Sequence, residues 1–502
     1  YADGMIFVGL GQGTIQAFNA DTMESLWVYQ DELKGQPNSQ IVYKNGYIYT
    51  GFWNSETQDA NFVCISVTDE EPSRTDEAKA ASWTCTRAGG YYWAGAYVAD
   101  SGKFLLEGTE DGASGYKTEN AQVLSLNPKT GEILDTLTLP YPGDIRSNIT
   151  HDTATGDYYF TSKGGYFYRV SVEEDGKFDQ SSLRWIKLEN GSSSTAMSTS
   201  TPTVYNGRAY IGVCGSGQFE EYSGHSIAVL DLSSMTVAYY VKTQGYPQTS
   251  GLLTKAYAGE DGTVYVYFFD NMTPGKLRVI SDKPGQTAPA ELTTEETPDG
   301  NVDTGYVLFT PSGAQTQYAL CSPIVDEYGT LYFRNDSNHM MALGSVITKL
   351  EVTKQPDKTV YQVGQSFDKT GMQVMATYQN GTVRDVTKYV TFSEEPLTEE
   401  DTDFAISFRH VLYQDRNGET GVDYTAPIAH VSLRIGEEEP EGAFITGSVS
   451  AWDAKQNMTF YLYDTSVSEE EIREDLWKIS PERGRKCRVS FSETAAAADS
   501  AR

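Results

Sequence analysis

The residues that could carry out chemistry are few in this sequence and stand far apart. Its five cysteines occur singly, so it has neither the C-x-x-C spacing of zinc and dithiol redox sites nor two adjacent cysteines. Spacings typical of zinc proteases, serine hydrolases, phosphate loops and EF-hands are also missing. We therefore predict no catalytic residues, no metal site and no cofactor. We interpret the cysteines as buried free thiols, although Cys64 and Cys85 could pair; the set is Cys64, Cys85, Cys214, Cys321 and Cys487.

Six polar and aromatic residues offer binding chemistry instead. Amide, hydroxyl and guanidinium groups form hydrogen bonds and aromatic rings stack, so such a set suits a peptide or a glycan. Each residue could equally fill an internal channel and hydrogen-bond through water. The six form one site only if the elements that carry them bring their loops to a common face. The predicted ligand-binding residues are Asn38, Trp93, Arg146, Ser198, Thr249 and Tyr318.

The composition indicates an almost entirely β-structured chain. Among 502 residues there are 34 Tyr and 46 Gly, with many short runs of Thr, Val and Tyr and little apolar periodicity of the helical kind. Only Ser468–Trp477 reads as a helix, because Ser468 and Glu471 have capping-box spacing. The length predicts about two to four domains.

The charge balance narrows the choice of partners. Sixty-nine acidic against 38 basic residues give a formal net charge of −31. This charge repels phosphates and anionic lipids, and no apolar stretch reaches about 18 residues, so we expect no nucleic-acid partner and no membrane insertion. The acidity is typical of a soluble extracellular protein. The chain opens at Tyr1 without a methionine or signal peptide, which we interpret as a mature or trimmed piece.

A short pattern recurs along the first two thirds of the chain. It consists of a glycine, one variable residue and three strand residues, of which the second is aromatic or Leu. Successive glycines lie 42, 56, 54, 51, 55 and 67 residues apart, a period in the range of propeller blades. Each glycine would supply a turn between antiparallel strands. The seven glycines are Gly4, Gly46, Gly102, Gly156, Gly207, Gly262 and Gly329.

Four short strands make up each unit, and such a sheet buries both faces only by packing on its neighbours in a ring. We therefore predict a seven-bladed β-propeller over residues 1–345, with eight blades possible in the full protein. The first unit lacks its innermost strand and the seventh its outermost strand. We expect both missing strands to come from upstream of Tyr1, which leaves a defective seam in this chain.

Three segments resemble the repeat of pyrroloquinoline-quinone-like propellers: TPTVYNGRAYIGV, IQAFNADTMESLW and VLSLNPKTGEI. The resemblance implies a quinone-dependent dehydrogenase with an adjacent Cys-Cys pair beneath the cofactor, a calcium ion held by carboxylates and an aspartate base. This sequence departs from that pattern, because no two cysteines are adjacent and only Trp27 and Trp185 stand at the tryptophan position that closes a blade. We therefore expect no quinone, since a fold does not dictate a function.

From Ile347 the sequence resembles a bacterial Ig-like domain of cell-surface proteins. We predict an Ig-like β-sandwich at 346–436, an acidic linker at 437–442, a partial C-terminal β-sandwich module at 443–475 and a disordered tail at 476–502. The resemblance rests on Pro356, Tyr361, Gly364, Asp368, Gly371 and a hairpin with Asn380-Gly381 at its tip.

These features together predict a non-catalytic binding or scaffold protein of a bacterial cell surface, extracellular and monomeric. Its propeller would present a funnel for a peptide or glycan, and the Ig-like domain would act as a spacer. Two alternatives remain open: a quinoprotein-like dehydrogenase, and a carbohydrate-active propeller with two carboxylates facing each other across the funnel.

Overall fold

The computed structural model describes residues 1–436 apart from several short segments. The predictions for the linker at 437–442, the module at 443–475, the tail at 476–502 and the helix Ser468–Trp477 lie outside the described residues. The segments within 1–436 that are not described are 116–117, 190–195, 216–224, 244, 256–257, 291–305, 327–328, 380 and 409–426.

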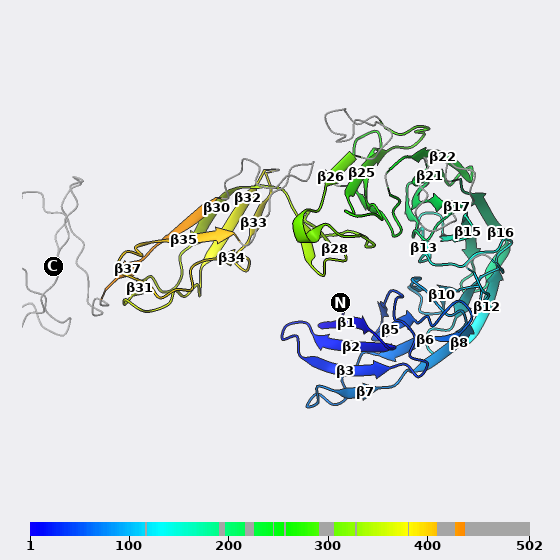
Figure 1. The fold of residues 1–502 in the computed structure, drawn as a ribbon, viewed down its shortest axis with the longest axis horizontal. Coiled ribbons are helices and arrows are strands. Elements are labelled where there is room, and N and C mark those ends of the chain that lie inside the picture. Colours follow the sequence, from blue (N-terminus) through cyan, green and yellow to red (C-terminus); the bar gives the residue numbers. More distant parts are fainter. Residues whose placement is uncertain are drawn as a thin grey trace, which may run out of the picture. The chain divides into compact units, whose positions relative to one another are not determined.

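Strands dominate the described residues (Figure 1), which confirms the all-β prediction. The one helical element described is the short 3-10 helix η1 (Gly313–Gln315). Among these residues, no helix has the length and apolar character needed to cross a membrane.

The first four main sheets have four strands each and follow one another in chain order. In the first, the strands are β1 (Met5–Leu10), β2 (Thr14–Asn19), β3 (Ser25–Gln30) and β7 (Glu77–Lys79). The second holds β4 (Val42–Lys44), β5 (Tyr47–Gly51), β6 (Asp59–Ser66) and β8 (Trp83–Ala88). The third holds β9 (Tyr97–Val98), β10 (Leu105–Gly108), β11 (Gln122–Leu126) and β12 (Ile133–Thr138). The fourth holds β13 (Thr150–His151), β14 (Asp157–Ser162), β15 (Tyr166–Val172) and β16 (Phe178–Lys187).

Three more main sheets follow, and a small pair of strands stands between the fourth and fifth. The pair is β17 (Ala196–Met197) with β20 (Cys214–Gly215). The fifth sheet holds β18 (Thr203–Tyr205), β19 (Arg208–Gly212), β21 (Ile227–Asp231) and β22 (Thr236–Val241). The sixth holds β23 (Leu252–Thr254), β24 (Val264–Phe269), β25 (Leu277–Asp282) and β26 (Tyr306–Phe309). The seventh has three strands, β27 (Ile324–Val325), β28 (Leu331–Arg334) and β29 (Met340–Leu343).

The repeated glycines take the conformation that the sequence pattern predicts. All seven have left-handed backbone angles, which a residue with a Cβ adopts only with strain. Six of them stand before the second strand of their sheet, where the chain reverses, and Gly4 stands before β1. Their φ angles are +74° at Gly4, +81° at Gly46, +64° at Gly102, +80° at Gly156, +74° at Gly207, +81° at Gly262 and +83° at Gly329.

The larger core clusters of residues 1–343 each join two consecutive sheets. In one, Trp27 of β3 packs with Ile48 of β5. In another, Leu106 of β10 packs with Phe160 of β14. Each sheet therefore buries its faces against its neighbours in chain order, which is how propeller blades gain their stability.

Two tryptophans fasten neighbouring sheets in the same way. The indole Nε1 of Trp27 donates a hydrogen bond to the carbonyl of Val67, just after β6 of the second sheet, at 3.3 Å. Trp83 of β8 donates to the carbonyl of Pro128 beyond β11, at 2.9 Å. Gly131 makes the second contact possible, because a Cβ there would lie 2.5 Å from Cε3 of Trp83. Both contacts bury a large ring and satisfy its polar atom.

Trp185, the second tryptophan at a closing position of the repeat, is not buried between sheets as Trp27 is. Trp185 lies on β16, as expected for the outer strand of a blade, but it is 41% exposed and its ring meets Tyr141 edge-on. Trp83 makes the interblade contact instead. In the sequence, β7 and its loops separate Trp83 from β6, so Trp83 does not stand where the repeat puts its closing tryptophan.

The outer edge of the first sheet is formed in an unexpected way. β7 pairs in parallel with β3 and puts Trp27 opposite Glu77. Along the chain β7 lies between β6 and β8, both of which belong to the second sheet. The buried Glu77 carboxylate accepts hydrogen bonds from the backbone N–H groups of Glu70 and Glu71, at 2.9 and 2.8 Å, and these fix the segment that carries β7.

Two strand edges of the first and last sheets stay open among the described residues, as the strand count predicts. β1 pairs with β2 on one side and has one isolated bridge, between Ala2 and Met5. The seventh sheet ends at β29, which pairs with β28.

The remaining strands form three small sheets with the character of an Ig-like region. They are β30 (Ile347–Lys354), β32 (Gln373–Tyr378) and β33 (Val383–Asp385); β34 (Val390–Thr391), β35 (Asp403–Phe408) and β36 (Ile428–Ser432); and the parallel pair β31 (Val360–Tyr361) and β37 (Arg434–Ile435). Tyr361 and Phe367 are buried in this region. Gly381, at the predicted hairpin tip, has a φ of +83°, whereas Asn380 lies outside the described residues.

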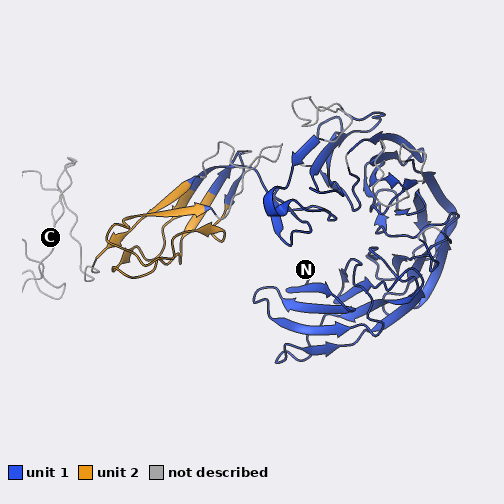
Figure 2. Cartoon of the chain, viewed as in Figure 1, with its two compact units in different colours: residues 1–350, 376–384, 408–427 blue, residues 351–375, 385–407, 428–502 orange. Residues whose placement is uncertain are grey.

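The chain divides into two compact units (Figure 2). The first contains Tyr1–Leu350 together with Ala376–Arg384, and the second is built on Glu351–Met375 and Asp385–Ser407 with the described residues from Ile428 on. All of the main sheets that resemble propeller blades belong to the first unit.

Candidate functional site

Loops from three consecutive sheets form the candidate site, which lies entirely in the first unit. In a four-stranded antiparallel sheet, the connection between the second and third strands emerges at the same end as the connection to the next sheet. The loops after β5, β8, β10, β12 and β14 are all of these two kinds. They therefore reach one face, and they carry Glu56, Tyr92, Glu110, Arg146 and Lys163 respectively.

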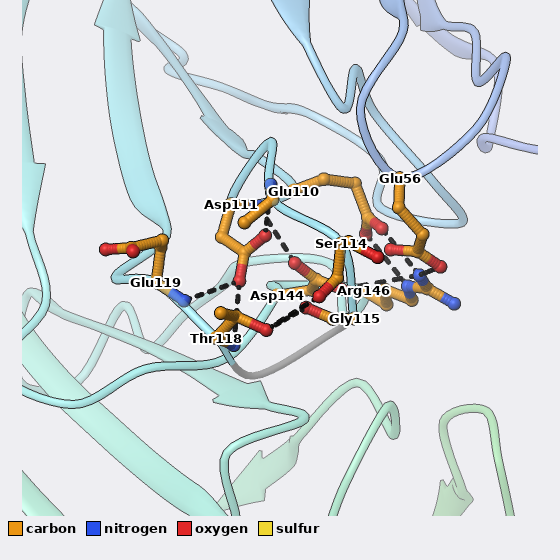
Figure 3. Close-up of polar contacts among 10 residues, drawn as sticks. Glu56, Glu110, Asp111, Ser114, Gly115, Thr118, Glu119, Asp144 and Arg146 are labelled. Carbon is orange, nitrogen blue, oxygen red and sulfur yellow. Dashed lines mark hydrogen bonds and ion pairs between the residues drawn. The ribbon is translucent and has the colours of Figure 1, made fainter.

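Arg146 is the centre of a charged cluster (Figure 3). Its Nε lies 2.8 Å from Oε1 of Glu110, and its Nη2 lies 2.5 Å from Oε2 of the same carboxylate, a two-pronged contact. The same Nη2 lies 3.3 Å from Glu56 and 3.4 Å from Asp144. Such a guanidinium fork both orients a carboxylate and neutralises it.

The cluster is covered from solvent except at one member. The side chains of Glu110 and Asp144 are 0% exposed and that of Arg146 is 4% exposed, whereas Glu56 is 34% exposed. Lys163 is also buried and interacts electrostatically with the four other charged groups. Three carboxylates therefore face two cations away from water. Because burial and the like charges of the carboxylates disfavour the ionised form, one of the three carboxylates tends to take up a proton.

The ionisation of the cluster follows from this arrangement. Burial, helped by the nearby Glu110 charge, raises the pKa of Asp144 to about 9. Burial also raises the pKa of Glu110, although Arg146 opposes the shift. Burial and then the Arg146 charge lower the pKa of Lys163 to about 8. For Arg146, burial works against the charged form, but the carboxylates outweigh it and raise its pKa. A protonated Asp144 leaves the five groups close to neutral.

A loop of the third sheet holds the carboxylates in place. The Asp111 N–H donates to Oδ1 of Asp144 at 2.8 Å. The Asp111 carboxylate accepts from the backbone N–H groups of Ala113, Thr118 and Glu119, at 2.8, 3.2 and 3.0 Å, which closes the loop on itself. Figure 3 shows Asp111 between this loop and the Arg146 cluster. Asp144 is thus held by a backbone N–H group as well as by Arg146, whereas the Glu110 carboxylate is held by Arg146.

Three aromatic rings lie beside the cluster, and we call them the aromatic ledge. Trp53 and Tyr92 stack with centroids 4.5 Å apart and planes at 21°. Tyr92 and Trp93 stack at 4.6 Å and 24°. The guanidinium carbon of Arg146 lies 4.4 Å from the centre of the Tyr92 ring and 5.7 Å from that of Trp93. All three rings are partly exposed, and burial raises the pKa of the Tyr92 hydroxyl.

Three of the six residues expected to bind a ligand lie together here. Trp93 and Arg146 contact each other, and Asn38 is close enough to the Tyr92 hydroxyl to lower its pKa, against the larger effect of burial. Sequence reasoning missed Tyr92, Trp53 and the charged partners of Arg146, because they lie in loops without a repeat and resemble solvated surface residues.

The other three expected residues have local structural contacts. The Ser198 hydroxyl is buried and donates to the carbonyl of Gly212 at 2.7 Å. The carbonyl of Thr249 accepts from the Ser200 hydroxyl at 2.6 Å. The carbonyl of Tyr318 accepts from the N–H of Asp336 at 3.0 Å. These contacts tie the three residues to neighbouring backbone groups.

The carboxylates of the cluster could be read as a metal site. Glu56, Glu110 and Asp144 offer ligand atoms that lie within 4.8 Å of one another. However, Nη2 of Arg146 is within 3.4 Å of an oxygen of each, so an arginine already stands where a cation would bind. A calcium ion beside a quinone would prefer such carboxylate oxygens but would have to displace Arg146 from them.

The cysteines described by the structure are free thiols. Cys64 of β6 and Cys85 of β8 lie on paired strands but face different partners, Trp83 and Phe62. Burial raises the pKa of the Cys64 thiol to about 12, which makes it unreactive.

Comparison with known proteins gives one family match. A family model described as "Bacterial Ig-like domain (group 3)" matches residues 354–405. The chain therefore contains a bacterial Ig-like domain, as its sequence predicts. A search of curated proteins gives no match.

Three solved structures resemble the chain at low identity. BamB from Moraxella catarrhalis is 14% identical, with 76% of this chain and 91% of that chain covered and a TM-score of 0.38. A europium-containing methanol dehydrogenase is 11% identical, with 55% and 72% covered and a TM-score of 0.31. The quinohemoprotein alcohol dehydrogenase ADHIIG from Pseudomonas putida HK5 is 13% identical, with 66% and 60% covered and a TM-score of 0.40.

Proposed function

We propose that this protein is a non-catalytic binding protein of a bacterial cell surface, and that the loop face around Arg146 receives a peptide or a glycan. The observation that carries the proposal is the pairing of the charged groups with one another beside an aromatic ledge that stays partly exposed. Such a face is rigid before the ligand arrives, which lowers the entropy lost on binding.

The burial and hydrogen bonding of Glu110 and Asp144 do not favour general acid–base catalysis by these two groups. Both oxygens of Glu110 accept hydrogen bonds from Arg146, and Asp144 accepts from Arg146 and from the N–H of Asp111. A general acid or base must reach the substrate within hydrogen-bond distance. Both carboxyl groups are fully covered, so a substrate could approach only Glu56.

The proposed location rests on the Ig-like domain. Domains of this kind are typical of bacterial surface proteins, where they hold a binding head away from the cell wall. The strong negative charge keeps such a chain soluble outside the cell. We propose that the chain is extracellular and acts as a monomer.

One observation favours a carbohydrate-active enzyme as the second candidate. Retaining glycosidases use two carboxyl groups about 5 Å apart, and the oxygens of Glu56, Glu110 and Asp144 are clustered on that scale. In addition, the pKa of Asp144, raised to about 9 mainly by burial, is suited to a general acid. This candidate requires that the cluster open to admit a sugar.

The test exposes the purified chain to immobilised oligosaccharides and peptides, and mass spectrometry then examines whatever binds. We expect saturable binding and recovery of the ligand intact. A second sample receives calcium and pyrroloquinoline quinone, and we expect neither a bound chromophore nor alcohol-dependent dye reduction.

Two results would overturn the proposal. Stoichiometric quinone binding with dye reduction would make the protein a dehydrogenase. Cleavage of a bound oligosaccharide would make it a carbohydrate-active enzyme, and the Glu56→Gln variant would then show whether the activity belongs to this chain or to a contaminant.

A further inference from the structure

We propose that the aromatic ledge of Trp53, Tyr92 and Trp93 binds the ring of a neutral sugar, with Glu56 as its hydrogen-bond acceptor. This inference rests on the proposed binding function and names the class of ligand.

The ring geometry is the first support. The centroid distances of 4.5 and 4.6 Å and the small interplanar angles show that Tyr92 stacks against both tryptophans, so the ring faces open to a ligand are those of Trp53 and Trp93 that point away from Tyr92. An aromatic face is electron-rich and attracts weakly positive C–H groups, and one face of a pyranose ring presents a set of such groups. The partial exposure of all three rings leaves surface for such a contact.

The backbone at Trp93 is the second, independent support. Trp93 has a φ of +66°, in the left-handed region that a bulky residue adopts only with strain. Several other residues with such angles, such as Asp3 and Asn45, directly precede a glycine in a turn, and Met23 and Met235 are the other bulky apolar residues with them. Among the described residues other than glycine, Trp93 is the only aromatic residue with a left-handed φ. Strain of this kind gathers where a side chain must be held in a particular place for function.

Two polar atoms beside the ledge supply the third support. Trp53 Nε1 and Glu56 Oε2 have no hydrogen-bond partner among the described residues. One is a donor and the other an acceptor, and a sugar hydroxyl can pair with either kind of atom. Both atoms are buried, although the Glu56 side chain as a whole is 34% exposed, so a ligand reaches them only by displacing part of their cover.

The local charges favour a neutral ligand over an ionic one. The Arg146 guanidinium already lies 4.4 Å from the Tyr92 ring and 5.7 Å from the Trp93 ring, so a second cation on the ledge would be repelled. An anion would meet Glu56, whereas the cations Arg146 and Lys163 are buried. A polyhydroxy ring carries no charge and needs what the site offers, a flat apolar face with a donor and an acceptor at its edge.

The experiment titrates the full chain with cellohexaose, chitohexaose and mannohexaose, and with hexalysine and hexagalacturonate as cationic and anionic probes. Tryptophan fluorescence and calorimetry report binding. We expect at least one neutral oligosaccharide to bind and neither charged probe to bind. Trp93→Ala should weaken binding by about tenfold or more, because central aromatic contacts dominate binding energies.

The controls separate a lost contact from a lost fold. Trp185→Ala removes an exposed tryptophan on β16, outside the site, and should change affinity by less than about twofold. If Trp93→Ala fails to fold by circular dichroism, Trp93→Phe and Glu56→Gln replace it, and each should weaken binding severalfold while the fold is kept.

Three outcomes would overturn the inference. The first is that none of the neutral oligosaccharides binds at concentrations up to about 10 mM, which covers weak binding sites. The second is that only a charged probe binds. The third is that a neutral sugar binds and the ledge variants leave its affinity unchanged. Binding of a peptide in the earlier panel would reject the sugar but leave the general binding function standing, so the two failures are distinguishable.

Discussion

Arg146 and Glu110 are joined by two parallel contacts in the interior of the first unit, at 2.8 and 2.5 Å, with side chains 4% and 0% exposed. Glu110 lies in the loop after β10 and Arg146 in the loop after β12 of the same sheet, 36 positions apart in the sequence. A buried ion pair of this kind contributes little more to stability than an apolar pair of the same size. Loss of one partner is costly, however, because it leaves the other charge buried without compensation.

Arg146→Met should therefore destabilise the protein strongly. It leaves Glu110, Asp144 and Glu56 without their shared cation, and we expect a loss of about 3–5 kcal/mol in the free energy of unfolding. Urea unfolding measures the change, and Arg184→Met, at an exposed position, is the control. Part of the loss should return in Arg146→Met combined with Glu110→Gln. A loss below about 1 kcal/mol, the scale of an exposed ion pair, would contradict the pairing.

Glu107 predicts a pH dependence of stability. Its side chain is fully buried on β10, neither oxygen has a hydrogen-bond partner among the described residues, and burial raises its pKa well above the ordinary value. The folded state thus holds a proton that the unfolded state releases above about pH 4.5. Stability from this group is fully present below that pH and falls as the pH rises toward the folded pKa.

Glu107→Gln should abolish this part of the pH dependence. At pH 4 the variant and the parent should be nearly equal, and at pH 8 the variant should be more stable by about 1–3 kcal/mol, because it buries no charge-prone group. Unfolding curves between pH 4 and 9 measure the difference. Glu132→Gln, at an exposed site, should follow the parent throughout; a constant offset for Glu107→Gln at every pH would rule out the assigned protonation.

Gly131→Ala should weaken the contact between the second and third sheets. The new Cβ would lie 2.5 Å from the Trp83 ring, and Gly131 also has a φ of +72°. Gly156→Ala is the matched control, since Gly156 has a φ of +80° and open space around it. We expect Gly131→Ala to lower stability by about 1–3 kcal/mol more than Gly156→Ala. Equal losses in the two variants would show that backbone strain alone is responsible.

Residues 346–436 should fold as an independent domain. The family match at 354–405 and the buried Tyr361 and Phe367 indicate a core of its own. Expressed alone, this segment should give a dispersed amide spectrum and a cooperative melting transition. A collapsed spectrum would show that the boundaries are wrong or that the segment needs residues of the first unit.

The open edge at β29 should promote self-association at high protein concentration. Met340 is 71% exposed on this strand, and unpaired strand edges attract other strands. Met340→Lys should lower the association constant severalfold, whereas Met23→Lys adds the same charge at an exposed turn and should not. Sedimentation velocity over a range of concentrations measures the effect. Equal behaviour of the two variants would remove the edge from the explanation.

Much of the fold could be predicted because it depends on local rules that recur. Gly46 and Gly207, for example, stand in turns that only a glycine adopts without strain, and the same turn returns at every repeat. The Ig-like region carried a similarly local pattern. By contrast, β7 was missed, because a three-residue strand that joins a different sheet leaves no periodic trace.

The candidate site was predicted only in part for a related reason. Trp93 and Arg146 were identified from their types and their positions before strands. Glu110 and Lys163 were not, since a single charged residue in a loop usually faces water, and burial depends on contacts between loops 36 to 53 positions apart along the chain. Such contacts arise from the tertiary arrangement, which no short sequence pattern encodes.

The parallel pairing of β7 with β3 sets an order for the synthesis of the protein. The first sheet cannot acquire its outer strand until Lys79 has left the ribosome, and by then β4, β5 and β6 of its neighbour have already emerged. The two sheets should therefore form as one cooperative block rather than in succession, and they should also open together. Amide hydrogens of β3 and β6 would then exchange with deuterium at a common rate. The first strands of the chain are thus protected from opening by residues synthesised about fifty positions later.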